Sequence, residues 1–194
     1  MKTLFTFGAI LMSLSIFCQP FNIAIAEERV SHSNPPMNYS AKDFSWHERK
    51  LNYITPPEKG KNPWVVLNGN HIKFKVGGTY YITASAPASQ CSEHKIALFD
   101  ASTKEIVLNG TSEYSPSVII SKDTITGIVT RSYLVGIIKV GGSGGEYYLS
   151  HYIHHNSGGQ FSFGIPADTK NGKDEEVYAQ VCIQKLNPVI SDEE

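Results

Sequence analysis

The sequence predicts an all-β protein whose strands pack as a β-sandwich or barrel. Short segments rich in β-branched and aromatic residues recur along the chain, separated about every 8–12 residues by turns of Gly, Asn and Pro. After the N-terminal leader, no window has the apolar spacing of an amphipathic helix. The composition agrees, because 10 Tyr and 16 Gly stand beside a charged fraction of only 18%, a balance that suits sheets joined by tight turns.

Residues 1–26 are predicted to be a secretory signal peptide. Lys2 supplies the positive charge, residues 4–17 are mostly apolar, and residues 24–26 have the small-x-small pattern of a cleavage site. The apolar stretch is shorter than the roughly 20 residues that a membrane-spanning helix needs, and no later run is long enough. The mature chain would begin at Glu27 and be secreted, periplasmic or attached to the cell surface.

Residues 27–63 are expected to form an N-terminal arm or linker. The segment is polar, has no clear period over 27–43 and ends in a Pro-rich turn region at 55–63. We expect one folded domain over residues 64–187, long enough to bury a core. Residues 188–194 then form a short acidic tail.

Eight to ten strands are expected in this domain. Asn-Gly-Asn at 68–70 predicts a hairpin turn between the first two strands. Pro87 is expected to end the third strand, and Asn-Gly at 109–110 to close the fifth. The expected strands are 64–67, 71–76, 79–85, 95–99, 106–108, at least two within 117–140, 146–155, 161–165 and 177–186.

Alternation of apolar and polar residues predicts which side chains point into the core. The Gly-rich segment 141–145 is expected to be a hairpin loop, because it lacks the Lys and the following helix of a phosphate loop. The predicted one-face sets are Ile72, Phe74 and Val76; Tyr147, Leu149, His151 and Ile153; and Val177, Ala179, Val181 and Ile183.

Charge and motifs exclude several function classes. The formal net charge is -1 and no basic stripe is present, so a nucleic-acid partner is not expected. The chain has neither a Gly-x-Ser-x-Gly nor a His-Glu-x-x-His motif, and its Ser, His and Asp residues are ungrouped. We therefore expect a protein that is not an enzyme and needs no cofactor.

Removal of the leader leaves two cysteines, Cys91 and Cys182. In an oxidising compartment they could form one disulfide, and the alternative is two buried thiols. Histidines cluster at His151, His154 and His155, but no carboxylate lies at a metal-ligand spacing, so no metal site is expected. The histidines suggest a polar strand end at a loop or subunit contact, which protonation near about pH 6 could loosen.

Several segments, in order, resemble one known family. They include Gly-Thr-Ser-Glu-Tyr at 110–114 and Thr-Arg-Ser-Tyr-Leu-Val-Gly at 130–136. These segments resemble the jelly-roll domain of tailed-phage tail-fibre and receptor-binding proteins and their bacterial and prophage relatives. That fold is similar to the tumour-necrosis-factor and complement globular-head jelly roll. The full set of matching segments is 78–88, 94–100, 107–114, 130–136, 148–151, 163–165 and 176–185.

The resemblance implies a two-sheet antiparallel jelly-roll sandwich of a kind that usually assembles as a trimer, in a module that binds or assembles. We expect a homotrimer that recognises a glycan or protein partner. It marks Glu113, Tyr114, Arg131 and Tyr133 as candidate binding or interface residues. Arg131 could pair with Glu113, and Tyr114 could stack in an interface. The alternative is that Arg131 and Glu113 are a solvated surface pair that contributes little to stability. The alternatives are a structural envelope-associated protein without a small ligand and, less favoured, a secreted hydrolase.

Overall fold

The computed structural model describes residues 23–31, 41–55, 64–121, 124–155, 162–165 and 175–186. These residues form thirteen strands and no helix, so no described helix could cross a membrane. The strands are β1 (Ile23–Ser31), β2 (Ser45–Glu48), β3 (Tyr53–Thr55), β4 (Val65–Asn68), β5 (His71–Phe74), β6 (Gly78–Ser89), β7 (Ser92–Asp100), β8 (Ile106–Ser115), β9 (Ser117–Ser121), β10 (Thr124–Gly127), β11 (Val129–Val140), β12 (Gly145–Ile153) and β13 (Glu175–Leu186).

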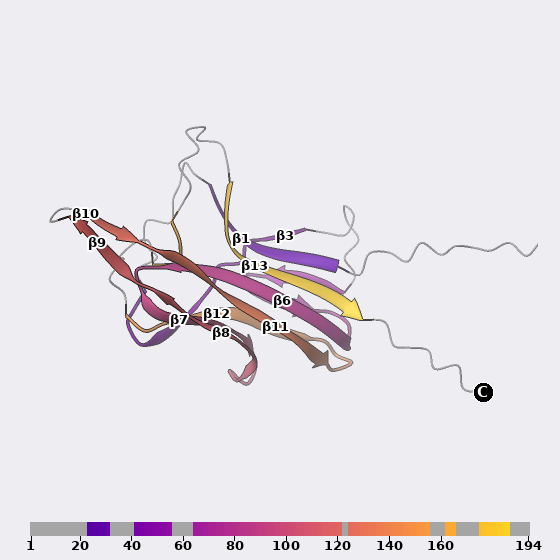
Figure 1. Cartoon of the computed structure of the whole chain (residues 1–194). Helices are drawn as coiled ribbons and strands as arrows, with labels where there is room; N and C mark the ends of the chain where they lie inside the picture. The colour runs from indigo at the N-terminus through magenta and orange to yellow at the C-terminus, as the bar shows by residue number, and fades with distance from the viewer. Residues whose placement is uncertain are drawn as a thin grey trace, which may run out of the picture.

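The strands make a two-layered antiparallel sandwich, as predicted. One layer has the order β3-β1-β13-β6-β11, and the other has β7-β12-β5-β4, with β2 also paired to β12. β8 pairs with both β11 and β7, so it connects the layers along one side. Figure 1 shows β1, β13, β6 and β11 in front, and the β9–β10 hairpin projecting from one end.

Side chains from both layers form one core, and most of the predicted alternation is confirmed. Tyr147, Leu149, His151 and Ile153 are all buried. Val76 and Val177 were predicted to share faces with core residues but are exposed. Val76 is exposed because it lies beyond the end of β5 at Phe74. Val177 is exposed because a register shift between β1 and β13 turns it outward and buries its neighbour Tyr178. The main core consists of residues from β1, β4–β7, β11–β13 and the segments beside them.

Two of the predicted turns are present where glycine is required. Gly69 joins β4 to β5 with a φ of +61°, a left-handed conformation that glycine adopts without strain. Gly144 closes the 141–145 loop by donating its N–H to the Gly141 carbonyl at 2.9 Å. The last expected short strand, 161–165, is not one: residues 162–165 form a turn and an irregular segment, and residue 161 lies outside the described residues.

Pro87 does not end its strand, contrary to the prediction. β6 continues through Pro87, which pairs with Arg131 of β11. β13 pairs with β6 only as far as Ser85, so the missing N–H of the proline removes no hydrogen bond to β13. Nearby, the Tyr178 carbonyl of β13 accepts a hydrogen bond from Nη2 of Arg131 at 2.8 Å.

The Asn109-Gly110 pair is not a turn either. β8 runs through it, with a register shift against β7 at this point. A Cβ on Gly110 would lie 2.7 Å from the Ile96 carbonyl oxygen and 2.8 Å from that of Tyr133. Glycine is needed because three backbones approach closely where the two layers meet.

The segment 27–63 is not a simple arm, because β1, β2 and β3 belong to the sheets. The sequence concealed β1 because three charged residues, 27–29, lie within it. The predicted cleavage point after Ala26 also falls inside β1, where Ala24 and Ala26 are buried. Residues 1–22 and the acidic tail lie outside the described residues.

The disulfide candidate is not formed. Cys91 is buried, Cys182 is partly buried, and both thiols are free. Cys182 pairs with Thr83 on β6, whereas Cys91 follows the end of that strand at Ser89. The strand between these positions, at about 3.3 Å a residue, separates the two cysteines by roughly 20 Å, far beyond the reach of a disulfide.

Candidate functional site

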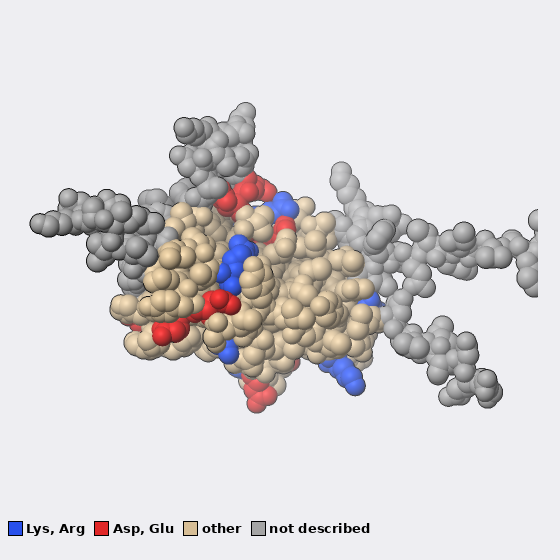
Figure 2. All heavy atoms as spheres, viewed as in Figure 1, with Lys and Arg blue, Asp and Glu red and all other residues tan. Residues whose placement is uncertain are grey.

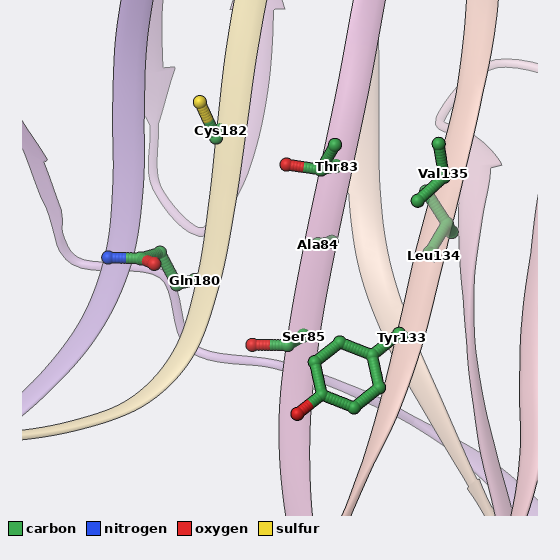
Figure 3. Close-up of a pocket in the computed structure, with 8 residues that line it drawn as sticks. All are labelled: Thr83, Ala84, Ser85, Tyr133, Leu134, Val135, Gln180 and Cys182. Atoms are coloured by element: carbon green, nitrogen blue, oxygen red, sulfur yellow. The ribbon is translucent and has the colours of Figure 1, made fainter.

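Nine outward side chains from three adjacent strands form what we call the uncharged face. The register of β13, β6 and β11 sets them in rows across the layer. Figure 3 shows two of the rows, which also line a pocket on this side of the sheet. The rows are Gln180, Ser85 and Tyr133; Cys182, Thr83 and Val135; and Gln184, Tyr81 and Ile137.

The β11 part of this face is both apolar and exposed. Tyr133, Val135 and Ile137 are 54%, 61% and 57% exposed, while the alternate residues Leu134 and Ile138 are buried in the core. β11 lies between β6 and β8, so this is an interior strand of the sheet rather than a frayed edge. Three large apolar side chains exposed beside one another make β11 the candidate for an interaction surface.

Charged groups lie at the borders of this face and not among its nine side chains. None of its nine side chains is Asp, Glu, Lys, Arg or His, and Figure 2 shows the molecule mainly tan over β6, β11 and β13. At one border the Gln180 amide donates to Glu27 at 2.7 Å. The Glu27 carboxylate is itself paired with Arg29 at 2.6 Å. The Ile23 and Ile25 positions of β1 extend two of the rows.

The four residues expected from the resemblance do not form one cluster. Tyr133 lies on the uncharged face, and Tyr114 is 57% exposed on β8. Arg131 makes no ion pair with Glu113 among the described contacts; it bonds the Tyr178 carbonyl and the Ser85 hydroxyl instead. Burial lowers the pKa of Arg131.

The three clustered histidines are also separated. His151 is fully buried, whereas His154 pairs with Glu93 at 2.9 Å and His155 pairs with Asp43 at 3.0 Å at the surface. Within the described ranges, no three His, Cys, Asp or Glu side chains come together as metal ligands. The surface pairs fit the predicted polar strand end, but His151 belongs to the interior.

A second feature, which the sequence did not reveal, is the inter-sheet network of Glu28, Arg49, His151, His94 and Thr130. Glu28 and Arg49 are an ion pair at 2.6 Å whose side chains are 2% and 1% exposed. The network continues from Arg49 to His151 at 3.3 Å, to His94 at 3.0 Å and to Thr130 at 2.7 Å. Alternation along the strand predicted only His151 to point inward. The sequence does not separate the other four residues from surface ones, since their partners come from distant segments.

Burial and nearby positive charge control the ionisation of this network. Desolvation lowers the pKa of His94 to about 4, and Glu113 opposes that shift only in part. Desolvation, followed by the Arg49 charge, lowers the pKa of His151 well below its usual value. Both imidazoles are therefore neutral at pH 7.

Comparison with known proteins gives a fold but no sequence relative. No protein-family model and no curated protein matches the chain. Among solved structures, Eiger TNF from S. frugiperda is similar with a TM-score of 0.51 and 12% identity, over 87% of this chain and 94% of that chain. Murine APRIL has a TM-score of 0.44 and 9% identity, over 84% of this chain and 97% of that chain. With its all-β sandwich and the similarity to Eiger TNF, this chain has a jelly-roll fold of the tumour-necrosis-factor type.

Proposed function

We propose that this chain is an exported, non-catalytic jelly-roll module that assembles as a homotrimer through the uncharged face. The observation that carries the proposal is the three consecutive outward residues of β11, each more than half exposed and apolar. Burying one such side chain contributes about 1.5–3 kcal/mol. Copies of the same chain can cover this face without leaving a buried charge unpaired, because its nine side chains carry none. The charged groups at its borders already have partners, since Glu27 pairs with Arg29 and Arg131 donates to the Tyr178 carbonyl.

Assembly is tested by mass and by one engineered charge. Sedimentation equilibrium of the purified protein at micromolar concentration is expected to give three times the chain mass. Val135→Glu should give a monomer, because a carboxylate buried without a partner costs more than the contact supplies. Thr103→Glu, in the exposed turn between β7 and β8 and outside the nine residues of the face, should remain a trimer. A wild-type protein that sediments as a monomer would refute the proposed assembly.

Cys182 gives the same experiment a chemical readout. Its thiol lies on the uncharged face and should be protected from a disulfide-exchange reagent in the trimer and reactive in Val135→Glu. Cys91 should stay unreactive in both, because burial raises the pKa of its thiol to about 12. Equal Cys182 labelling in the two proteins would mean that assembly uses another surface.

For the partner, we propose a glycan bound on the outer side of the second layer. Trp46 is 36% exposed, and its ring contacts those of Phe99 and Tyr152, with centroids 5.1 and 5.5 Å apart. Flat aromatic faces of this kind stack on sugar rings, and Glu48 on the same strand supplies a hydrogen-bond acceptor. A glycan array comparing wild type with Trp46→Ala tests this. A stable oligomer with no wild-type hits would favour the structural envelope protein instead.

A further inference from the structure

The inter-sheet network joins strands of both layers inside the sandwich. Glu28 lies on β1 and Thr130 on β11, both in the first layer, while His151 on β12 and His94 on β7 belong to the second. Arg49, which follows β2, is the link between Glu28 and His151. The network therefore crosses the core at one end and fastens the layers to each other.

The direction of every hydrogen bond in the network is fixed by Arg49. A guanidinium only donates, so Nδ1 of His151 must accept from Nη1 of Arg49. The hydrogen of neutral His151 is then on Nε2, which donates to Nδ1 of His94 at 3.0 Å. In turn Nε2–H of His94 donates to Oγ1 of Thr130 at 2.7 Å, and the Thr130 hydroxyl donates to the Tyr114 carbonyl at 3.3 Å.

Either imidazole can take up a proton only by breaking this series. A hydrogen on Nδ1 of His94 would point at the Nε2–H of His151, and a hydrogen on Nδ1 of His151 would point at Arg49. The Arg49 charge repels both imidazolium ions, and Glu28 is already paired with Arg49. Glu113 on β8 favours protonation of His94, whereas His47 on β2 disfavours protonation of His151. The phenol of Tyr178 on β13 interacts with both Glu28 and Arg49, and the Arg131 guanidinium on β11 adds a second positive charge that interacts with Arg49.

We propose that the inter-sheet network is an acid-sensitive latch, which holds this end of the sandwich closed at neutral pH and opens it when the imidazoles gain protons. The neighbouring apolar cluster, which includes Cys91, Ile153 and Phe163, would open with it. Arg49 also bonds the Phe163 carbonyl at 3.3 Å, so release of the network frees that segment as well. The latch depends on the geometry of one chain and not on the proposed trimer.

The sign and the size of the effect follow from linkage. A histidine whose pKa is lowered by folding stabilises the closed state fully above about pH 6.5, and the stabilisation is lost as the pH falls toward 4. With a pKa of about 4 for His94 when closed and about 6.5 when open, opening becomes on the order of 50-fold more favourable between pH 7 and pH 4.5. His151 adds to this in the same direction.

The test is amide hydrogen exchange of the purified protein at pH 7 and pH 4.5, corrected for the intrinsic rate. Amides of β12 around His151 should lose on the order of 50-fold in protection at pH 4.5, while those of the β4–β5 hairpin change little. His94→Gln with His151→Gln should abolish the difference, and His155→Gln, at the surface, should keep it. An equal acid response in the double variant would overturn the latch.

A measurement on the wild type keeps the proposal refutable if the double variant fails to fold. Nuclear magnetic resonance can follow the protonation of each buried imidazole through its ring protons as the pH is lowered. His94 and His151 should stay neutral down to about pH 5. Titration of both buried imidazoles near about pH 6.5 would refute the proposal.

Discussion

Replacing Glu28 by Gln should be among the most destabilising single changes in this protein. The side chain keeps its size but loses the charge that neutralises Arg49. Because the Arg49 side chain is only 1% exposed, solvent cannot take the place of the lost carboxylate. Removing one partner of a buried ion pair costs about 3–5 kcal/mol. Since domains of this size unfold with only about 5–15 kcal/mol, Glu28→Gln should lose a large part of its stability, and its melting temperature should fall by roughly 6–20 °C.

The chain provides a matched control for this experiment. Arg29 pairs with Glu175 at 3.0 Å, but those side chains are 28% and 57% exposed, so Glu175→Gln should cost no more than about 1 kcal/mol. Urea unfolding followed by the fluorescence of Trp46 and Trp64 measures both variants.

A double replacement separates charge from packing at the same position. Glu28→Leu with Arg49→Met removes both charges and keeps apolar volume, so it should be more stable than Glu28→Gln. If Glu28→Gln lost as little stability as Glu175→Gln, another group would have to compensate the Arg49 charge. The Glu28–Arg49 ion pair would then not be what stabilises the inter-sheet network.

Two further predictions concern the place where the two layers meet at β8. Gly110→Ala should cost about 1–3 kcal/mol or more in stability, because its Cβ would lie 2.7 Å from the Ile96 carbonyl oxygen. The control is Gly142→Ala, whose Cβ would have nothing within 4 Å and which should change stability by less than about 0.5 kcal/mol. Equal urea midpoints for the two variants would refute this prediction. Ser132→Ala should cost about 1–3 kcal/mol, because the buried hydroxyl accepts from the Ile96 N–H at 3.0 Å and donates to the Thr111 carbonyl at 2.6 Å; an unchanged midpoint would contradict it.

Local pattern was enough to predict the elements whose faces differ clearly. The alternation from Tyr147 to Ile153 predicted the inward side of β12 correctly, and the Asn-Gly-Asn triplet predicted the β4–β5 turn. Both signals depend on residues within a few positions of one another. The same reasoning failed at Pro87 and Gly110, where strands from elsewhere in the chain decide the outcome. Pro87 can lie within β6 because β13 does not pair with it, and Gly110 is needed because β7 and β11 pass close to its backbone.

The candidate sites were harder to predict because they depend on contacts between distant segments. Tyr133 was named from a resemblance, but the face around it exists only because β6, β11 and β13 align in register. Glu28 looked like part of a solvated arm, and only the position of Arg49 explains how a carboxylate can occupy a buried strand. The spacing of His94 and His151 in the sequence gives no sign that they touch.

The position of β1 beside β13 has a consequence for how the protein reaches its native state. These strands come from opposite ends of the described sequence, and β13 separates β1 from β6. This layer cannot be completed before β13 has been synthesised, because β1 pairs with β13 and not with β6. Such long-range pairing predicts slow folding, so the newly made polypeptide should remain without its complete first layer for some time after β13 has been synthesised.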